Sequence, residues 1–109
     1  MGDRLSRLLN EREWLLADGA TGTNLFALGL QHGDSPELWN LEHPDLVRQH
    51  YRSFIDAGSD IFLTNSFGGT RHRLKLHGAE DRVYEINKRA AELGREEADK
   101  EDRPVVVAG

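Results

Sequence analysis

Two stretches of the sequence place polar side chains directly after short apolar runs. The first run ends at Asp18 and continues as "DGATGTN", in which one carboxylate precedes glycines and other small residues. The second run ends in "TNSFGG", residues 64–69. A carboxylate can hold an ammonium group, while backbone N–H groups without side chains around them can be approached closely by an anion. These stretches therefore hold the candidate binding chemistry.

Spacing alone leaves two interpretations of Asp18 open. In one, Asp18 holds an ammonium group of a ligand, while backbone amides or a helix start bind a carboxylate or phosphate. In the other, Asp18 caps a turn and the glycines only permit tight backbone. The stretch lacks both the G-x-G-x-x-G spacing of dinucleotide-binding loops and the lysine of a Walker loop, so it does not predict nucleotide binding.

The second stretch has the same ambiguity. Thr64, Asn65 and Ser66 offer polar groups at a strand end, and Phe67 either walls an apolar pocket or lies in the core. The two glycines that follow let the loop turn. Trp39 in "SPELWN" is expected to anchor a loop, with a pocket wall as the alternative.

A metal site is not predicted from these residues. The chain has no cysteine, so neither a disulfide nor a thiolate metal site can form within it. None of the five histidines form an i, i+4 pair around a glutamate, which is the helical zinc-binding pattern.

Three apolar runs predict strands buried on both faces of a parallel sheet, because they are short, continuous and rich in branched residues. They cover residues 14–18, 60–65 and 104–109. Short helices are expected at 23–30 and 70–76, and a loop at 31–40.

Two longer helices are expected between the strands. Residues 43–60 have Pro44 suited to a first helical turn and Gly58 suited to a left-handed stop. Their apolar stripe consists of Leu46, Val47, Tyr51, Phe54 and Ile55. In the second helix, the stripe consists of Val83, Ile86, Ala90 and Leu93.

Strands that alternate with helices predict an α/β fold with parallel pairing. A closed (β/α)8 barrel typically needs about 250 residues, whereas this chain has 109. We therefore expect residues 1–109 to be the N-terminal segment, about three β/α units, of one larger barrel domain.

Composition narrows the possible partners. The net charge is −5 and the basic residues are scattered among acidic ones, so nucleic acid is not an expected partner. The sequence has no apolar stretch near the roughly 20 residues that span a bilayer and no apolar segment typical of a secretory signal. We expect a cytoplasmic protein without membrane contact.

Several separated motifs, in order, resemble the homocysteine S-methyltransferase family. They are "DGATGTNL", "PELWN", "HPDLVRQHYRSFIDAGSDIFLTNSFGGT" and "VVVAG", and together they extend over roughly residues 15–109. Agreement of several motifs in order is far more specific than any one of them.

This resemblance implies a zinc-dependent (β/α)8 barrel that transfers a methyl group from a small donor to the thiol of homocysteine, giving methionine. It assigns Asp18 to the substrate ammonium, with the Gly19 backbone alongside, and places Thr64, Asn65, Ser66 and Phe67 around the homocysteine pocket. The family binds zinc through cysteines, which this chain lacks. The ligands are expected beyond Gly109, and the fragment alone is expected to be inactive.

A different class of function stays open. A truncated barrel could act as a small binding module for an amino acid, oligomerising through its open strand edges. A homo-oligomer is expected in either case. The methyl donor, which could be betaine, S-methylmethionine, another onium compound or methylcobalamin, does not follow from the sequence.

Overall fold

The computed structural model describes residues 4–109, which form several helices and a small two-stranded parallel sheet. In chain order the elements are α1 (Arg4–Glu11), α2 (Gly22–Ala27), the 3-10 turn η1 (Pro36–Leu38), α3 (Trp39–Glu42), α4 (Pro44–Asp56), β1 (Ile61–Leu63), α5 (Arg71–Leu74), the 3-10 turns η2 (Lys75–His77) and η3 (Glu80–Arg82), α6 (Val83–Asp99) and β2 (Val106–Ala108).

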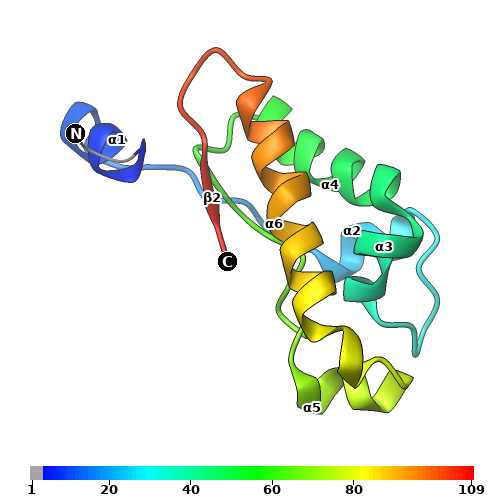
Figure 1. The fold of residues 1–109 in the computed structure, drawn as a ribbon. Helices are drawn as coiled ribbons and strands as arrows, with labels where there is room; N and C mark the ends of the chain where they lie inside the picture. Colours follow the sequence, from blue (N-terminus) through cyan, green and yellow to red (C-terminus); the bar gives the residue numbers. More distant parts are fainter. Residues whose placement is uncertain (1–3) are drawn as a thin grey trace.

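The sheet confirms the predicted parallel pairing. β1 and β2 run parallel with Ile61 opposite Val106, and Ala17 forms an isolated parallel bridge with Ile61 on the other side of β1. The first segment, β1 and β2 therefore lie side by side in chain order. Helices α4 and α6 lie together on one side of these strands (Figure 1), as expected for crossover connections.

The first apolar run departs from the prediction of a buried strand. Only Ala17 in this run pairs with the sheet, through that single bridge. Trp14 is 66% exposed and Leu16 is also exposed, as is Leu63 of β1. The prediction of strands buried on both faces was wrong for the described residues, because the helices cover only one face of the sheet.

Helix α4 begins and ends where its start and stop residues predict. Pro44 occupies the first turn, where its missing N–H costs no hydrogen bond, and Gly58 follows the end with a φ of 106°. Val47, Tyr51 and Ile55 are buried. They recur at the spacing of one helical face, so α4 packs its apolar stripe into the core.

Helix α6 provides the other half of that core. Ile86, Ala90 and Leu93 are fully buried, as the sequence pattern predicts. Phe62 of β1 is also fully buried, and a methyl group added to Gly94 would lie 3.4 Å from its ring. The absence of a side chain at Gly94 lets the helix approach the sheet closely.

Two segments differ from the predicted secondary structure. The expected loop at 31–40 ends in η1 and the start of α3, and Trp39 is buried in the main core rather than anchoring a loop. The helix α1 was not predicted. It contacts the rest of the chain through Arg4, which donates to the Val105 carbonyl and pairs with Asp99.

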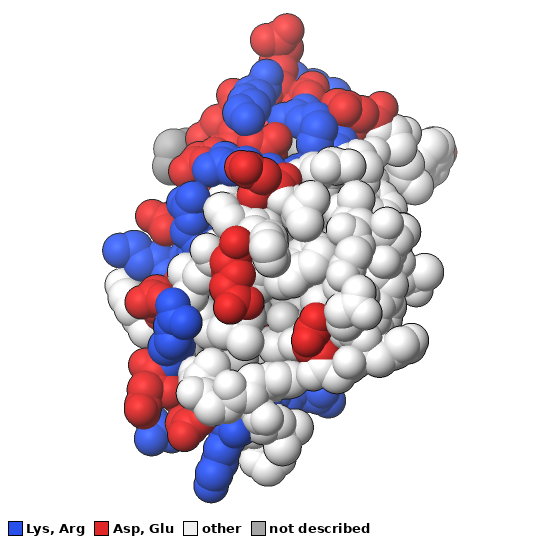
Figure 2. Space-filling model, turned by 90° about the vertical axis from the view of Figure 1, so that its right-hand side faces the viewer, with Lys and Arg blue, Asp and Glu red and all other residues white. Residues whose placement is uncertain are grey.

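Charged side chains of both signs mix over the upper part and one side of the molecule, next to a broad area with few charges (Figure 2). None of the described helices is long and apolar enough to cross a membrane.

Candidate binding site at the strand ends

Asp18 fixes the end of the first segment to β1. Its backbone N–H donates to the Ile61 carbonyl, and its Oδ2 accepts from the Leu63 N–H, each at 3.0 Å. The carboxylate thereby takes a ladder position that a backbone carbonyl normally fills. The side chain is half-buried, and its other oxygen has no hydrogen bond in the described part of the chain. Asp18 thus combines a structural role with a remaining acceptor.

The polar residues after β1 have different partners. The Thr64 and Ser66 hydroxyl oxygens are 2.7 Å apart. The Asn65 side chain is buried, and its Nδ2 donates to the Pro36 carbonyl and to Asn40 Oδ1. Asn40 Nδ2 in turn donates to the Asn65 carbonyl at 2.9 Å. The Asn65 amide therefore holds the 36–40 segment against the strand end, while the two hydroxyls face the cavities described below.

A tyrosine of α4 supports this strand end from within the core. The Tyr51 hydroxyl accepts from the Asn65 N–H at 2.7 Å and donates to the Ala90 carbonyl at 3.3 Å. Burial raises the pKa of Tyr51 to about 12; the hydrogen bond from Asn65 opposes this shift and the negative charge of Asp18 adds to it. A neutral phenol thus joins α4, α6 and the strand end at neutral pH.

His50 is a buried imidazole on the same helix. It is 2% exposed, neither ring nitrogen has a hydrogen-bond partner within residues 4–109, and its ring packs edge-on against Phe54. Burial lowers the pKa of His50 from its ordinary value, and the charge of Asp18 opposes the shift. His50 is therefore favoured as the neutral form beneath the first segment, where a side chain on Gly19 would contact Phe54.

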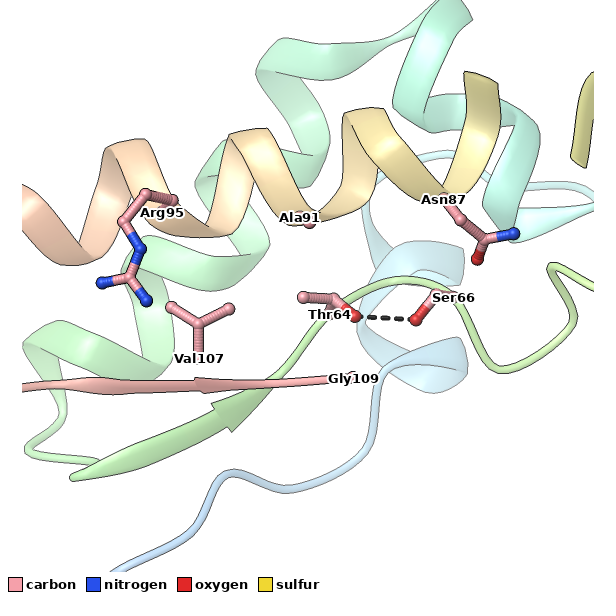
Figure 3. Close-up of a pocket in the computed structure, with 7 residues that line it drawn as sticks. All are labelled: Thr64, Ser66, Asn87, Ala91, Arg95, Val107 and Gly109. Atoms are coloured by element: carbon pink, nitrogen blue, oxygen red, sulfur yellow. Dashed lines mark hydrogen bonds between the residues drawn. The ribbon is translucent and has the colours of Figure 1, made fainter. Parts of the chain in front are cut away.

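Two cavities meet at Thr64 and Ser66. The larger, about 500 Å³, lies between α6 and β2 and is lined in addition by Asn87, Ala91, Arg95, Val107 and Gly109 (Figure 3). It is on the side of the sheet that the helices cover. The smaller, about 350 Å³, is lined by Thr21, Gly22, Pro36, Glu37 and the run from Leu63 to Phe67.

We take the smaller cavity as the candidate binding site, because the two predicted motifs meet there. Thr64, Asn65, Ser66 and Phe67 line it, as do Thr21 and Gly22 of the first motif. Asp18 and Gly19 are not among its lining residues. Cavities at the carboxyl ends of parallel strands are the usual ligand sites of α/β folds.

Glu37 is a cavity residue that was not among those predicted from the sequence. Glu37 is 7% exposed and lines the cavity from η1. The sequence indicates this role only weakly, because Glu37 is a single acidic residue in "PELW". An acidic residue at this position is also explained by its favourable charge in the first turn of a helix. Phe67 is 86% exposed, so it walls the cavity and does not enter the core.

The two glycines of "TNSFGG" lie against neighbouring side chains that leave no room for a side chain of their own. A Cβ on Gly68 would lie 2.6 Å from Glu37 Oε1, and one on Gly69 would lie 2.5 Å from Asn87 Oδ1. Neither has a positive φ. They are glycines because neighbouring polar side chains occupy the space that a methyl group would need, and the loop is held by Asn87 Nδ2, which donates to the Gly69 carbonyl.

The described residues do not fit a zinc site. Within residues 4–109, no group of three His, Cys, Asp or Glu side chains comes together in a way that could hold a metal ion, and the sequence has no cysteine. Zinc chemistry is therefore not built into this part of the structure.

The structure is an α/β arrangement with a cavity at the carboxyl ends of its parallel strands. The sequence profile described as homocysteine S-methyltransferase matches residues 15–109. This match extends over most of the chain, so the chain belongs to the homocysteine S-methyltransferase family.

Known relatives agree with this membership. The chain is 29% identical over 96 residues to methionine synthase from Mycobacterium tuberculosis, a match that spans 83% of this chain and 8% of that protein. It is 30% identical over 109 residues to betaine–homocysteine S-methyltransferase 1 from Bos taurus, spanning 93% of this chain and 26% of that one.

A solved structure also matches the fold. The metallated form of the homocysteine methyltransferase MmuM from Escherichia coli superposes with a TM-score of 0.85 at 27% identity. The match covers 98% of this chain and 40% of that structure. The chain thus spans less than half the length of each of these relatives.

Proposed function

We propose that the protein containing this chain transfers a methyl group from a small donor to the thiol of homocysteine, giving methionine. In that reaction the homocysteine thiolate forms the new sulfur–carbon bond, the bond between the methyl carbon and the donor breaks, and the thiol proton leaves before attack because the thiolate is the nucleophile. The donor is a betaine-like, S-methylmethionine-like or methylcobalamin-linked group.

The proposal rests on one observation: the motifs that identify the family also line the cavity at the strand ends. The family match begins at residue 15, just before the first motif, and residues of both motifs line one cavity at the strand ends. We assign the amino-acid part of homocysteine to this cavity. Asp18 and Gly19, which lie outside the cavity lining of this chain, are assigned to its ammonium, and Thr64, Asn65, Ser66 and Phe67 line the rest.

The fold supports a corresponding domain proposal. Two parallel strands, a third paired segment and two crossover helices on one face correspond to about three β/α units. We propose that residues 1–109 are the N-terminal segment of one (β/α)8 barrel domain. The exposed side chain of Leu63, which alternates with the buried Phe62 along β1, would then face the barrel interior, on the side of the sheet away from α4 and α6.

A zinc ion belongs to the proposal for the complete protein only. The relatives are homocysteine methyltransferases, and the matching structure from Escherichia coli is a metallated form. The residues described here do not form such a site, so its ligands would come from outside this chain. We also propose that the complete protein is a homo-oligomer and acts in the cytoplasm.

The test compares protein from the complete reading frame with the 109-residue chain. Zinc content and methylation of homocysteine are measured on both, with betaine, S-methylmethionine and methylcobalamin as donors. We expect about one zinc per chain and activity in the complete protein, and neither in the 109-residue chain. Metal-free complete protein that methylates homocysteine with none of these donors would contradict the proposal.

A further inference from the structure

We propose that Glu37 is a further acceptor for the α-ammonium group of the amino-acid substrate. The inference rests on the proposed function and adds to it a residue that comes from a different segment than Asp18. A primary ammonium has three N–H donors, so a site that recognises it fully offers more than one acceptor.

Glu37 differs from the other buried acidic residues described. Asp60 pairs with Arg12 at 2.6 Å and with Arg103 at 3.5 Å. Glu97 pairs with Lys100 at 2.5 Å and with two arginines of α4, Arg48 and Arg52. Each of these carboxylates therefore has cations that offset the loss of hydration.

Glu37 has no ion pair in the described part of the chain. Its side-chain hydrogen bond comes from the Ser35 hydroxyl, which is 3.2 Å from Oε1. Removing a carboxylate from water without a cationic partner is unfavourable. A ligand ammonium that enters the adjoining cavity would provide the missing positive charge.

The surroundings of Glu37 suit such a ligand. Glu37 lines the same cavity as Thr64 and Ser66, whose hydroxyls add further acceptors. Gly68 leaves room for the carboxylate, because any side chain at that position would overlap Glu37 Oε1. The loop that carries Ser66 and Phe67 is thus shaped around this acidic group.

The cavity favours a cation with N–H donors over a fully methylated one. Fully methylated cations are recognised mainly by aromatic faces. The aromatic ring here, Phe67, already has the Arg73 guanidinium 5.4 Å from its centroid. Arg73 and His77 line a neighbouring cavity that also includes Glu37. In the candidate site itself, Glu37 and the hydroxyl oxygens of Thr21, Thr64 and Ser66 can accept from a primary ammonium.

The experiment measures binding by calorimetry on protein from the complete reading frame. The two ligands are L-homocysteine and 4-sulfanylbutanoate, which has the same thiol and carboxylate but lacks the ammonium. Glu37→Gln is compared with wild type and with Glu42→Gln, a matched control at an exposed acidic position on α3. Glu37→Asp, which retains the charge on a shorter side chain, repeats the comparison if the glutamine variant does not fold.

We expect Glu37→Gln to weaken L-homocysteine binding by about tenfold to a hundredfold and to leave 4-sulfanylbutanoate binding unchanged. Glu42→Gln should change neither. Equal weakening of both ligands would show that Glu37 only shapes the cavity, and an unchanged homocysteine affinity would show that it has no role; either result overturns the inference alone. Wild-type protein that does not bind homocysteine would overturn the proposed function and the inference together.

Discussion

The Tyr51 hydroxyl accepts a hydrogen bond from the backbone N–H of Asn65 at 2.7 Å, and through it the interior of α4 supports the end of β1. The same hydroxyl donates to Ala90 on α6. One phenol therefore joins the two crossover helices to the loop that lines the candidate site. The position of Thr64 and Ser66 depends on a residue that does not itself line the cavity.

Replacing Tyr51 with phenylalanine should lower the free energy of unfolding by about 1–3 kcal/mol, because the Asn65 N–H and the Ala90 carbonyl lose their buried partner. Denaturant unfolding of the complete protein measures this. Tyr84→Phe is the control, since Tyr84 is exposed. Equal stability of the two variants would contradict the structural role of the Tyr51 hydroxyl.

Asp18 is predicted to act through both its charge and its hydrogen bond. Asp18→Asn keeps an oxygen that can accept from the Leu63 N–H but removes the charge, so it should weaken homocysteine binding about tenfold to a hundredfold at nearly unchanged stability. Asp18→Ala should lose both binding and stability, together with activity. Calorimetric titration and thermal unfolding separate the two effects, and a fully active alanine variant would exclude a binding role for Asp18.

Gly69→Ala should destabilise the protein by about 1–3 kcal/mol, because its methyl group overlaps the Asn87 side chain. Gly22→Ala is the matched control: apart from chain neighbours and its own helix backbone, no atom of the described residues lies within 4 Å of the added methyl group, and Gly22 begins a helix. That control should be neutral or slightly stabilising. Unfolding midpoints of both variants test the difference, and a stable Gly69→Ala protein would show that Asn87 moves aside freely.

Because His50 is buried, we expect the free energy of unfolding to decrease in mild acid. In the unfolded chain a histidine has a pKa near 6.5, and burial lowers the pKa of folded His50 below that value. At pH values between these two pKa values, the unfolded chain binds more protons than the folded chain. The contribution of neutral His50 to the free energy of unfolding is therefore complete above pH 6.5 and is lost as the pH falls through the folded pKa. The free energy of unfolding falls through this effect by at most about 1.4 kcal/mol per pH unit.

The measurement is the free energy of unfolding between about pH 7.5 and pH 5 for wild type, His50→Leu and the exposed-position control His77→Gln. The leucine variant should show a shallower decline than the other two proteins. Identical pH profiles for all three would mean that His50 does not contribute to acid sensitivity.

The 109-residue chain by itself is predicted to self-associate. Leu16 and Leu63 are exposed, Leu63 on the face of β1 opposite the buried Phe62, and β2 pairs only with β1 among the described strands. Exposed apolar strand faces and open edges favour pairing with another chain. Light scattering should show an oligomer, which Leu63→Lys should reduce; a monomer at high concentration would contradict this prediction.

Much of the fold could be predicted because its signals are local. The apolar stripes and end residues of α4 and α6, and the parallel order of the strands, follow from periodicity and from Pro44 and Gly58. The exposure of Trp14 and the burial of Trp39 could not be predicted. Both depend on which faces other elements cover, and residue type alone does not specify this.

The sequence by itself determined the family, the two long helices α4 and α6 and the polar residues at the strand ends, because spacing and turn chemistry act within a few residues of each position. Only the tertiary structure decided what these residues contact. Asp18 accepts from Leu63, the Asn65 amide binds Asn40, and Glu37 is buried beside Gly68 without an ion pair in the described residues. These contacts join segments that are distant in the chain, so they exist only once the helices and strands pack together.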